Sequence, residues 1–480
     1  MAPGCNHGAV RGDRESGRVV GRMMVALGLA LVGCGSESGE GTGDAASGGI
    51  ASGGVETAAG SSGAAETANT ATASASGTSS TGPGGSATDS AADDTNGSGP
   101  KFDVTAPDGG TNCGAGGMMG DETFSYIWIA NSSQGTVSKI NTQTLVEEGR
   151  YIVRDDSAGN PSRTSVNLSG DVAVANRAGG VVKIWANIED CQESNGMPGI
   201  QTSSGPNDVL AWGVEECIAW YTPFPQYGTQ RPLAWTQGTL NESTCQYENQ
   251  KIWTSGRAAL SQAGPADVVL MDGDTGVVEQ TVTIPASSGW AGLYGGAVDG
   301  EGNFWTVDHD WSAGNSELIR VNMADFTYDI WPTELEVHYG LAVDSVGRAW
   351  LCGGGVTSRF DPVTETWAHP ANTTPSGSVY GGCMTDGNGI LWHSRNGDSM
   401  MLGIDTETLD IVQSHPLPAY VHGVSIDFDG YVWGVEFAGS NAYRLDPATG
   451  QVDTVSGLVG AYTYSDMTGF ALSAAGVPSG

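Results

Sequence analysis

Basic residues are scarce in this chain. It has 19 Lys and Arg against 54 Asp and Glu, which gives a formal net charge of -35. A surface this acidic repels phosphate backbones, so nucleic acid is not expected as a partner. The acidity suits cations or cationic ligands, and it also keeps an exported protein soluble.

The common catalytic and metal-binding signatures are missing as well. The sequence contains no Gly-x-Ser-x-Gly, Walker A, His-Glu-x-x-His or dinucleotide fingerprint, which excludes the commonest hydrolase, nucleotide-binding and metalloprotease classes. No Cys-x-x-Cys pair occurs, so a zinc site is not expected. No amphipathic helical stretch of useful length appears, and an all-β fold is therefore predicted.

Residues 35–100 lack aromatic residues, Lys and Arg, and consist mostly of Gly, Ser, Ala and Thr. Such a segment cannot bury enough apolar surface to offset the entropy of ordering it. We therefore expect residues 34–120 to form a disordered tether that holds the rest of the chain, residues 121–480, away from its attachment point.

Residues 1–33 have the pattern of a signal peptide. Four arginines precede the ten-residue apolar run Met23–Val32, which is too short to span a bilayer. The sequence Leu31-Val32-Gly33-Cys34 resembles the lipobox of bacterial lipoproteins, which implies a lipid on Cys34 and a membrane partner. The predicted location is the cell envelope, outside the cytoplasm, and Gly35 favours the outer membrane. The alternative is an uncleaved anchor with a chance cysteine.

Cysteines suit an oxidising compartment. After the signal segment and Cys34 are set aside, six remain, enough for three disulfides in fifteen possible pairings. Cys191, Cys217 and Cys245 share one irregular region, so a bridge among them is predicted.

An internal repeat predicts the fold. The segments 295–305, 340–350, 382–392 and 423–433 each place an acid six residues before a tryptophan, as in Asp427 and Trp433. Successive tryptophans are 45, 42 and 41 positions apart. A period of this length with only β elements is typical of β-propellers built from four-stranded blades. Gly430 and its counterparts fall where a hairpin loop needs a left-handed residue.

The two ends of the repeat region complement each other. Residues 126–141 supply a second and third strand without a first, and residues 465–472 supply a first strand with nothing after it. The prediction is a propeller of seven four-stranded blades, closed by pairing of N- and C-terminal strands, and monomeric. Six or eight blades stay open, because residues 177–260 are irregular.

The repeat unit Gly-x-x-x-Asp-x-x-Gly-x-x-Trp resembles that of the streptogramin B lyase (virginiamycin B lyase) family. This likeness implies a seven-bladed propeller that opens a cyclic depsipeptide by magnesium-assisted elimination with a His as general base. The nearest stretch here runs from His422 to Asn441 and includes Glu436. Val435 stands where the lyases commonly have Thr, and lactonase-type and non-enzymatic propellers share the same loose repeat.

Several polar residues are predicted to surround one mouth of the channel. Counting equal numbers of residues outward from the turn of each hairpin places His422 opposite Glu436 and Tyr294 opposite Asp308. His309 then lies beside Asp308. His393 and Arg395 leave the equivalent strand of a further blade. In this hypothesis His309, His422 and His393 are catalytic, Tyr294 and Arg395 bind ligand, and Asp308 and Glu436 hold a divalent cation, magnesium or calcium. The alternative is that they are solvated or hydrogen-bonded to strand ends.

Two functions follow from these patterns. The first is a lipid-anchored propeller that binds a small molecule, glycan or protein at its channel mouth. The second is a divalent-metal-dependent lyase or lactonase acting at the same place.

Overall fold

The computed structural model describes residues 125–475 with short exceptions. The exceptions are residues 242, 245, 261–262, 288–291, 309–315, 335–338, 354–356, 372–380 and 396. The described part is built from β-strands, with one short α-helix, α1 (Phe470–Ala474), and one 3-10 turn, η2 (Ile188–Asp190). The predicted all-β class is confirmed. No described helix has the length and apolarity needed to cross a membrane. The signal segment and tether lie outside the described residues.

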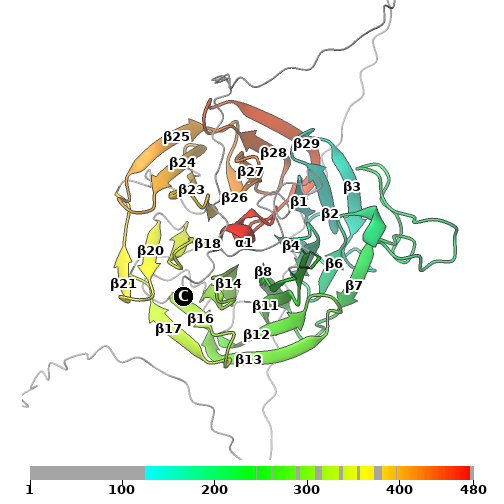
Figure 1. Ribbon diagram of the computed structural model, residues 1–480, viewed down its shortest axis with the longest axis horizontal. Coiled ribbons are helices and arrows are strands. Elements are labelled where there is room, and N and C mark those ends of the chain that lie inside the picture. The colour runs from blue at the N-terminus through cyan, green and yellow to red at the C-terminus, as the bar shows by residue number, and fades with distance from the viewer. Residues whose placement is uncertain are drawn as a thin grey trace, which may run out of the picture. The chain divides into compact units, whose positions relative to one another are not determined.

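Five antiparallel sheets of four strands follow one another along the chain (Figure 1). The first two are β4 (Pro161–Val166), β5 (Val172–Asn176), β6 (Val181–Ile184) and β7 (Ile218–Thr222), then β8 (Thr229–Trp235), β11 (Lys251–Arg257), β12 (Gly264–Asp272) and β13 (Val278–Ser287). The other three are β14 (Leu293–Val298), β15 (Phe304–Asp308), β16 (Glu317–Val321) and β17 (Tyr328–Pro332); β18 (Gly340–Val343), β19 (Ala349–Cys352), β20 (Ser358–Asp361) and β21 (Thr366–Ala368); and β22 (Cys383–Thr385), β23 (Ile390–Arg395), β24 (Met400–Asp405) and β25 (Ile411–Pro416). The small hairpin of β9 (Thr239–Asn241) and β10 (Gln246–Glu248) is inserted between the first two strands of the second sheet.

The remaining strands join the two ends of the described chain. They are β26 (Val421–Ile426), β27 (Val432–Glu436), β28 (Gly439–Leu445), β29 (Val452–Ala461), β1 (Tyr126–Asn131), β2 (Thr136–Asn141) and β3 (Glu147–Ile152), in this sheet order. β29 meets β1 only at Ala461 and Asn131. Beyond that point the C-terminal segment runs along β1, because Tyr462 N–H donates to Ala130 O and Trp128 N–H donates to Met467 O.

The sequence placed this last strand a few residues too late. It was expected at 465–472, whereas the backbone pairing with β1 involves 461–467 and the chain then turns into α1. The reason is Asp466, whose carboxylate accepts the N–H groups of Gly469 and Leu472 and so starts a helical turn.

The first strands of the sheets, here called the inner strands, lie around a common centre. Each contacts the next, from β4 through β8, β14, β18 and β22 to β26, and Figure 1 shows α1 at this centre. Glycines permit the close approach. A Cβ on Gly382 would lie 2.6 Å from His422 O, and one on Gly423 would lie 2.0 Å from Thr463 O. Thr463 in turn lies 3.0 Å, oxygen to oxygen, from Thr164 of β4.

The core lies between neighbouring sheets and is centred on the repeated tryptophans. Trp305, Trp350, Trp392 and Trp433 are buried, as their position on the second strand predicted. Gly430 has a φ of 83°, in the left-handed region that its place in the hairpin loop requires.

Two disulfides occur among the described residues. Cys191–Cys217 confirms the bridge predicted in the irregular region, and it lies in the segment between β6 and β7. Cys352–Cys383 joins β19 to β22 of the following sheet. Cys113 and Cys245 lie outside the described residues.

Candidate functional site

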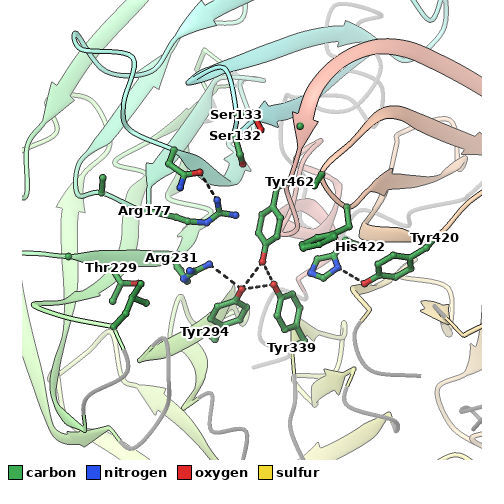
Figure 2. Close-up of a pocket in the computed structure, with 17 residues that line it drawn as sticks. Ser132, Ser133, Arg177, Thr229, Arg231, Tyr294, Tyr339, Tyr420, His422 and Tyr462 are labelled. Carbon is green, nitrogen blue, oxygen red and sulfur yellow. Dashed lines mark hydrogen bonds between the residues drawn. The ribbon is translucent and has the colours of Figure 1, made fainter. Parts of the chain in front are cut away.

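A cavity of about 660 Å³ opens between the inner strands at one end (Figure 2). Its lining comes from the segments that enter the inner strands and from those that leave the strands paired with them, such as Thr229 in β8 and Phe437 after β27. At the other end Leu472 of α1 helps line a much smaller cavity of about 40 Å³. The larger cavity has the volume of a small-molecule site.

The side chains at the base of the large cavity share one position in the repeat. Tyr294, Tyr339 and His422 each stand five residues before the acid of their own hairpin turn, and Arg231 stands five before Thr236, which takes the place of that acid. Tyr462, from the C-terminal segment, completes the group. The repeat therefore brings together side chains that are far apart in the sequence.

Three tyrosine hydroxyls meet here in a hydrogen-bonded triangle (Figure 2). The Tyr294 hydroxyl lies 2.6 Å from that of Tyr339 and 2.9 Å from that of Tyr462, and the Tyr339 and Tyr462 hydroxyls are also hydrogen-bonded. Arg231 Nη1 donates to the Tyr294 hydroxyl at 3.3 Å. All three tyrosines are buried, so the triangle is held away from bulk water.

Arginines change the ionisation of this triangle. Burial alone raises the pKa of Tyr294, but the positive charges of Arg231 and Arg163 and the hydrogen bonds from Tyr462 and Tyr464 bring that pKa below its usual value. Burial and the neighbouring Tyr294 raise the pKa of Tyr462 to about 12. Of these two tyrosines, Tyr294 therefore carries negative charge more easily than Tyr462.

His422 is a neutral imidazole in an aromatic surround. Its ring centroid lies 4.5 Å from that of Tyr339 and 4.8 Å from that of Phe437, and its Nδ1 is hydrogen-bonded to the Tyr420 hydroxyl. Burial, with smaller contributions from Arg163 and Arg177, lowers the pKa of His422 well below its usual value. A neutral imidazole can accept a proton or a hydrogen bond from a ligand.

Among the predicted site residues that the structure describes, Tyr294 and His422 line this cavity and the others do not. Glu436 pairs with Val421 rather than with His422. Its carboxylate accepts hydrogen bonds from the Ser440 and Asn441 N–H groups and from the Tyr443 hydroxyl, so it organises a turn.

Asp308 also does not face the residue predicted opposite it. It pairs with Leu293, while Tyr294 pairs with Val307, and its carboxylate is hydrogen-bonded to Ser287 at 2.7 Å. In both hairpins a β-bulge adds one residue to the inner strand and shifts the register beyond it. The facing pairs expected from symmetric hairpins are therefore not formed.

The other predicted residues do not line the cavity. His393 is buried against Thr357, with Nδ1 2.8 Å from its hydroxyl, and burial followed by the charge of Arg395 lowers the pKa of His393 to about 4. Arg395 forms an ion pair with Asp398 at 2.7 Å. His309 lies outside the described residues.

The predicted metal ligands Asp308 and Glu436 form hydrogen bonds within the protein. No group of three or more His, Cys, Asp or Glu is found among them in a geometry that could hold a metal ion. The carboxylates expected to bind it are engaged in a turn and with a serine, as described above.

Sequence reasoning missed Tyr339, Arg231 and Tyr462. The signal for the first two was present, since each stands five residues before the turn position of its repeat, as Tyr294 and His422 do. Tyr462 lies outside the regular repeat and could be placed only once the end of the chain was located.

No protein-family model and no curated protein matches this chain. Among solved structures, a streptogramin B lyase is 18% identical with a TM-score of 0.36, over 42% of this chain and 64% of the lyase chain, so the match spans less than two thirds of that protein. Virginiamycin B lyase from Staphylococcus aureus is 13% identical with a TM-score of 0.44, over 64% and 89% of the two chains. AztD from Citrobacter koseri is 13% identical with a TM-score of 0.42, over 72% and 95%. The fold assignment rests on the strand pairing described above and not on these matches.

Proposed function

We propose that this protein is a lipid-anchored, extracytoplasmic propeller of seven blades that binds a small molecule in the cavity between its inner strands. In this proposal β1 to β3 and the C-terminal segment 461–467 form the seventh blade. The observation that carries the function is the cavity itself, with a volume of about 660 Å³ and with Arg231, Tyr294, Tyr339 and His422 in its lining from one repeat position.

The shape and chemistry of the cavity support a small molecule over a flat protein partner. Aromatic side chains supply apolar wall, and a few polar groups, the tyrosine triangle and His422, converge at its base. Ligand pockets combine these two features.

The binding test uses the full chain and a library of sugars, organic acids, amino acids and lactones. We expect at least one class to raise the melting temperature, and the exposed cavity residue Ala178, changed to Trp, to abolish that rise by filling the site. Ala448→Trp, on an exposed turn, is the matched control. A rise that Ala178→Trp leaves intact would place binding elsewhere, and no rise with any compound would overturn the function.

The anchor is tested separately through Cys34. In a bacterial host, the Cys34→Ala variant should lose incorporation of labelled palmitate and appear in the soluble fraction instead of the membrane fraction. Equal labelling of the variant and the unaltered protein would overturn the anchor and leave the cavity proposal standing.

An elimination or lactone-opening reaction is the second candidate, favoured by the position of His422 in the cavity lining, where its imidazole could take a proton from a bound substrate. No metal step is derived, since the described His, Cys, Asp and Glu residues gather no ligand set. Turnover of cyclic depsipeptides or lactones that is lost in His422→Gln would support it. Restoration by magnesium after EDTA treatment would show that a cation takes part.

A further inference from the structure

The three phenol oxygens of the tyrosine triangle have the spacing of ligands on one face of a metal ion (Figure 2). The Tyr294 hydroxyl lies 2.6 Å from that of Tyr339 and 2.9 Å from that of Tyr462, and the Tyr339 and Tyr462 hydroxyls are hydrogen-bonded to each other. In octahedral coordination with metal–oxygen bonds of about 2 Å, adjacent oxygens lie about 2.8 Å apart. The two distances bracket this value.

The triangle is built into the fold and is reached from the cavity. Tyr294 belongs to β14, Tyr339 precedes β18, and Tyr462 follows β29, so three separate elements hold the oxygens. The rings pack on one another, with 4.7 Å between the centroids of Tyr294 and Tyr339. All three tyrosines line the cavity although they are buried. An ion that enters the cavity therefore meets three oxygens that the fold has already brought together.

The chemistry of these oxygens selects the metal. They are phenols, unlike the His, Cys, Asp and Glu groups that gather no metal site among the described residues. A phenol ordinarily loses its proton only near pH 10, so a metal that displaces three such protons at neutral pH must be a strongly polarising cation. Magnesium and calcium favour carboxylates and carbonyls, and zinc favours Cys and His. Tyrosine is an established ligand of iron in proteins.

We infer that the tyrosine triangle is a binding site for a ferric ion, which Tyr294, Tyr339 and Tyr462 hold through their phenolate oxygens. Three iron–oxygen bonds form as three phenol protons leave to solvent. The iron stays ferric throughout, so no oxidant or reductant takes part. This site goes beyond the proposed function, because it needs no organic ligand and leaves the rest of the cavity available to one.

Arginines beside the triangle favour the phenolate state that the metal requires. Arg231 Nη1 donates to the Tyr294 hydroxyl at 3.3 Å, and the guanidinium carbon of Arg177 lies 4.0 Å from the ring centroid of Tyr462. The guanidinium carbon of Arg163 lies 4.7 Å from the ring centroid of Tyr294. Positive charge next to a phenol stabilises its phenolate form. Three phenolates and one ferric ion sum to zero charge, so these arginines adjoin a neutral cluster and not a bare cation.

Ferric nitrilotriacetate, added to the full chain at neutral pH, tests the site directly. We expect a visible charge-transfer absorption band, which phenolate-bound ferric iron produces and iron on surface carboxylates does not. The same addition should raise the melting temperature, and magnesium chloride should not. Resonance Raman spectra excited in the band should show the vibrations of iron-bound tyrosine.

Tyrosine variants locate the metal. Tyr294→Phe, Tyr339→Phe and Tyr462→Phe each keep the packed ring and remove one ligand oxygen, so each should weaken iron binding by at least about tenfold. Tyr328→Phe is the matched control, because Tyr328 lies in β17 and does not line the cavity, and it should bind iron as the unaltered protein does. Melting curves without metal identify the variants that fold, and one folded variant of the three is enough to decide.

The outcomes separate this inference from the proposed function. If the unaltered protein shows no visible band with ferric nitrilotriacetate, the iron site is wrong, while the compound library and Ala178→Trp still test the small-molecule proposal. A band that persists unchanged in a folded variant of the triangle would place the iron elsewhere and overturn the inference as well. So would a band that Tyr328→Phe reduces as strongly as the triangle variants do.

Discussion

The recurring acid and tryptophan of the repeat form a single structural unit. In the hairpin of β14 and β15, one oxygen of Asp299 accepts the N–H groups of Glu301 and Asn303, and the other accepts the indole N–H of Trp305 at 2.8 Å. The same carboxylate thus shapes the turn and satisfies a buried indole. This explains why six residues always separate the two.

One repeat departs from the rule in an instructive way. In the hairpin of β4 and β5, Asn167 takes the place of the acid. The residue six positions after Asn167 is Ala173, where the other repeats have tryptophan. Asn167 still accepts the N–H groups of Ser169 and Asp171, so the turn is kept. Where no indole needs an acceptor, a carboxylate is not required.

A double-mutant cycle tests this pairing. Asp299→Asn places an amide where two acceptor oxygens are needed, and we expect it to lower the free energy of unfolding by about 1–3 kcal/mol in urea denaturation. In a Trp305→Phe background the same change should cost about 1 kcal/mol less. Asp274→Asn, on an exposed turn, is the control and should change stability by less than about 0.5 kcal/mol. Additive effects of the two substitutions would contradict the pairing.

The buried His393 should make the free energy of unfolding depend on pH. Its pKa is about 4 in the folded protein because the ring is buried, against an ordinary value near 6.5. As the pH falls, the histidine therefore takes up its proton in the unfolded chain before it does so in the folded protein. The stabilising contribution of the neutral, buried ring to the free energy of unfolding is present above pH 6.5 and is lost toward pH 4, by up to about 3 kcal/mol.

The His393→Gln variant measures that contribution. It keeps a hydrogen-bonding partner for Thr357 but cannot titrate. Between pH 7 and pH 4 its free energy of unfolding should fall by about 3 kcal/mol less than that of the unaltered protein. Parallel curves for the two proteins would show that His393 is not held neutral.

The positions of some candidate site residues could be predicted from the sequence, and those of others could not. The repeat correctly brought Tyr294 and His422 to one end of the inner strands. It could not place Glu436 and Asp308, because a bulge adds one residue to the inner strand and moves each acid out of register. A β-bulge inserts one extra residue into one strand of a pair, and counting residues outward from a symmetric turn does not include such an insertion.

At the scale of elements, the Cys352–Cys383 disulfide joins two neighbouring sheets through β19 and β22. Both cysteines are buried, and the bridge closes a loop with a sequence separation of 31. The sequence could not assign this pair, because fifteen pairings were open and the two residues belong to neighbouring repeats.

Removing this bridge should loosen the junction between β19 and β22. In the Cys352→Ser, Cys383→Ser double variant we expect the free energy of unfolding to fall by about 3–4 kcal/mol, since a loop of this length then regains its entropy when unfolded. Dithiothreitol should reduce the bridge only under unfolding conditions, because both sulfurs are inaccessible. Rapid reduction in the folded state would contradict the burial.

At the scale of the whole molecule, the sequence period gave the number of residues per sheet and the approximate start of each sheet. The repeat segments 295–305, 340–350, 382–392 and 423–433 begin within two residues of the starts of β14, β18, β22 and β26. The period could not give the C-terminal pairing in detail. Residues 461–467 carry no repeat signature, and their place depends on β1, which lies more than 300 residues earlier.

The joining of the two chain ends predicts a strong effect of one small substitution. A Cβ on Gly423 would lie 2.0 Å from the carbonyl oxygen of Thr463, so Gly423→Ala must push the C-terminal segment away from β26. The Thr463–Thr164 contact and the hydrogen bonds to β1 depend on that segment. We expect a loss of more than about 2 kcal/mol in the free energy of unfolding, the size usual for overpacking a core.

Gly264→Ala is the matched control, because a Cβ there meets nothing within 4 Å, and it should leave stability unchanged or slightly raised. Hydrogen exchange supplies the second measurement. In Gly423→Ala the Trp128 amide, which donates to Met467 O, should lose protection before the amides of β15 and β16 do. If protection falls equally in all sheets, or if the substitution is as mild as Gly264→Ala, the C-terminal segment does not join the ends of the chain, and the seven-bladed closure proposed here is wrong.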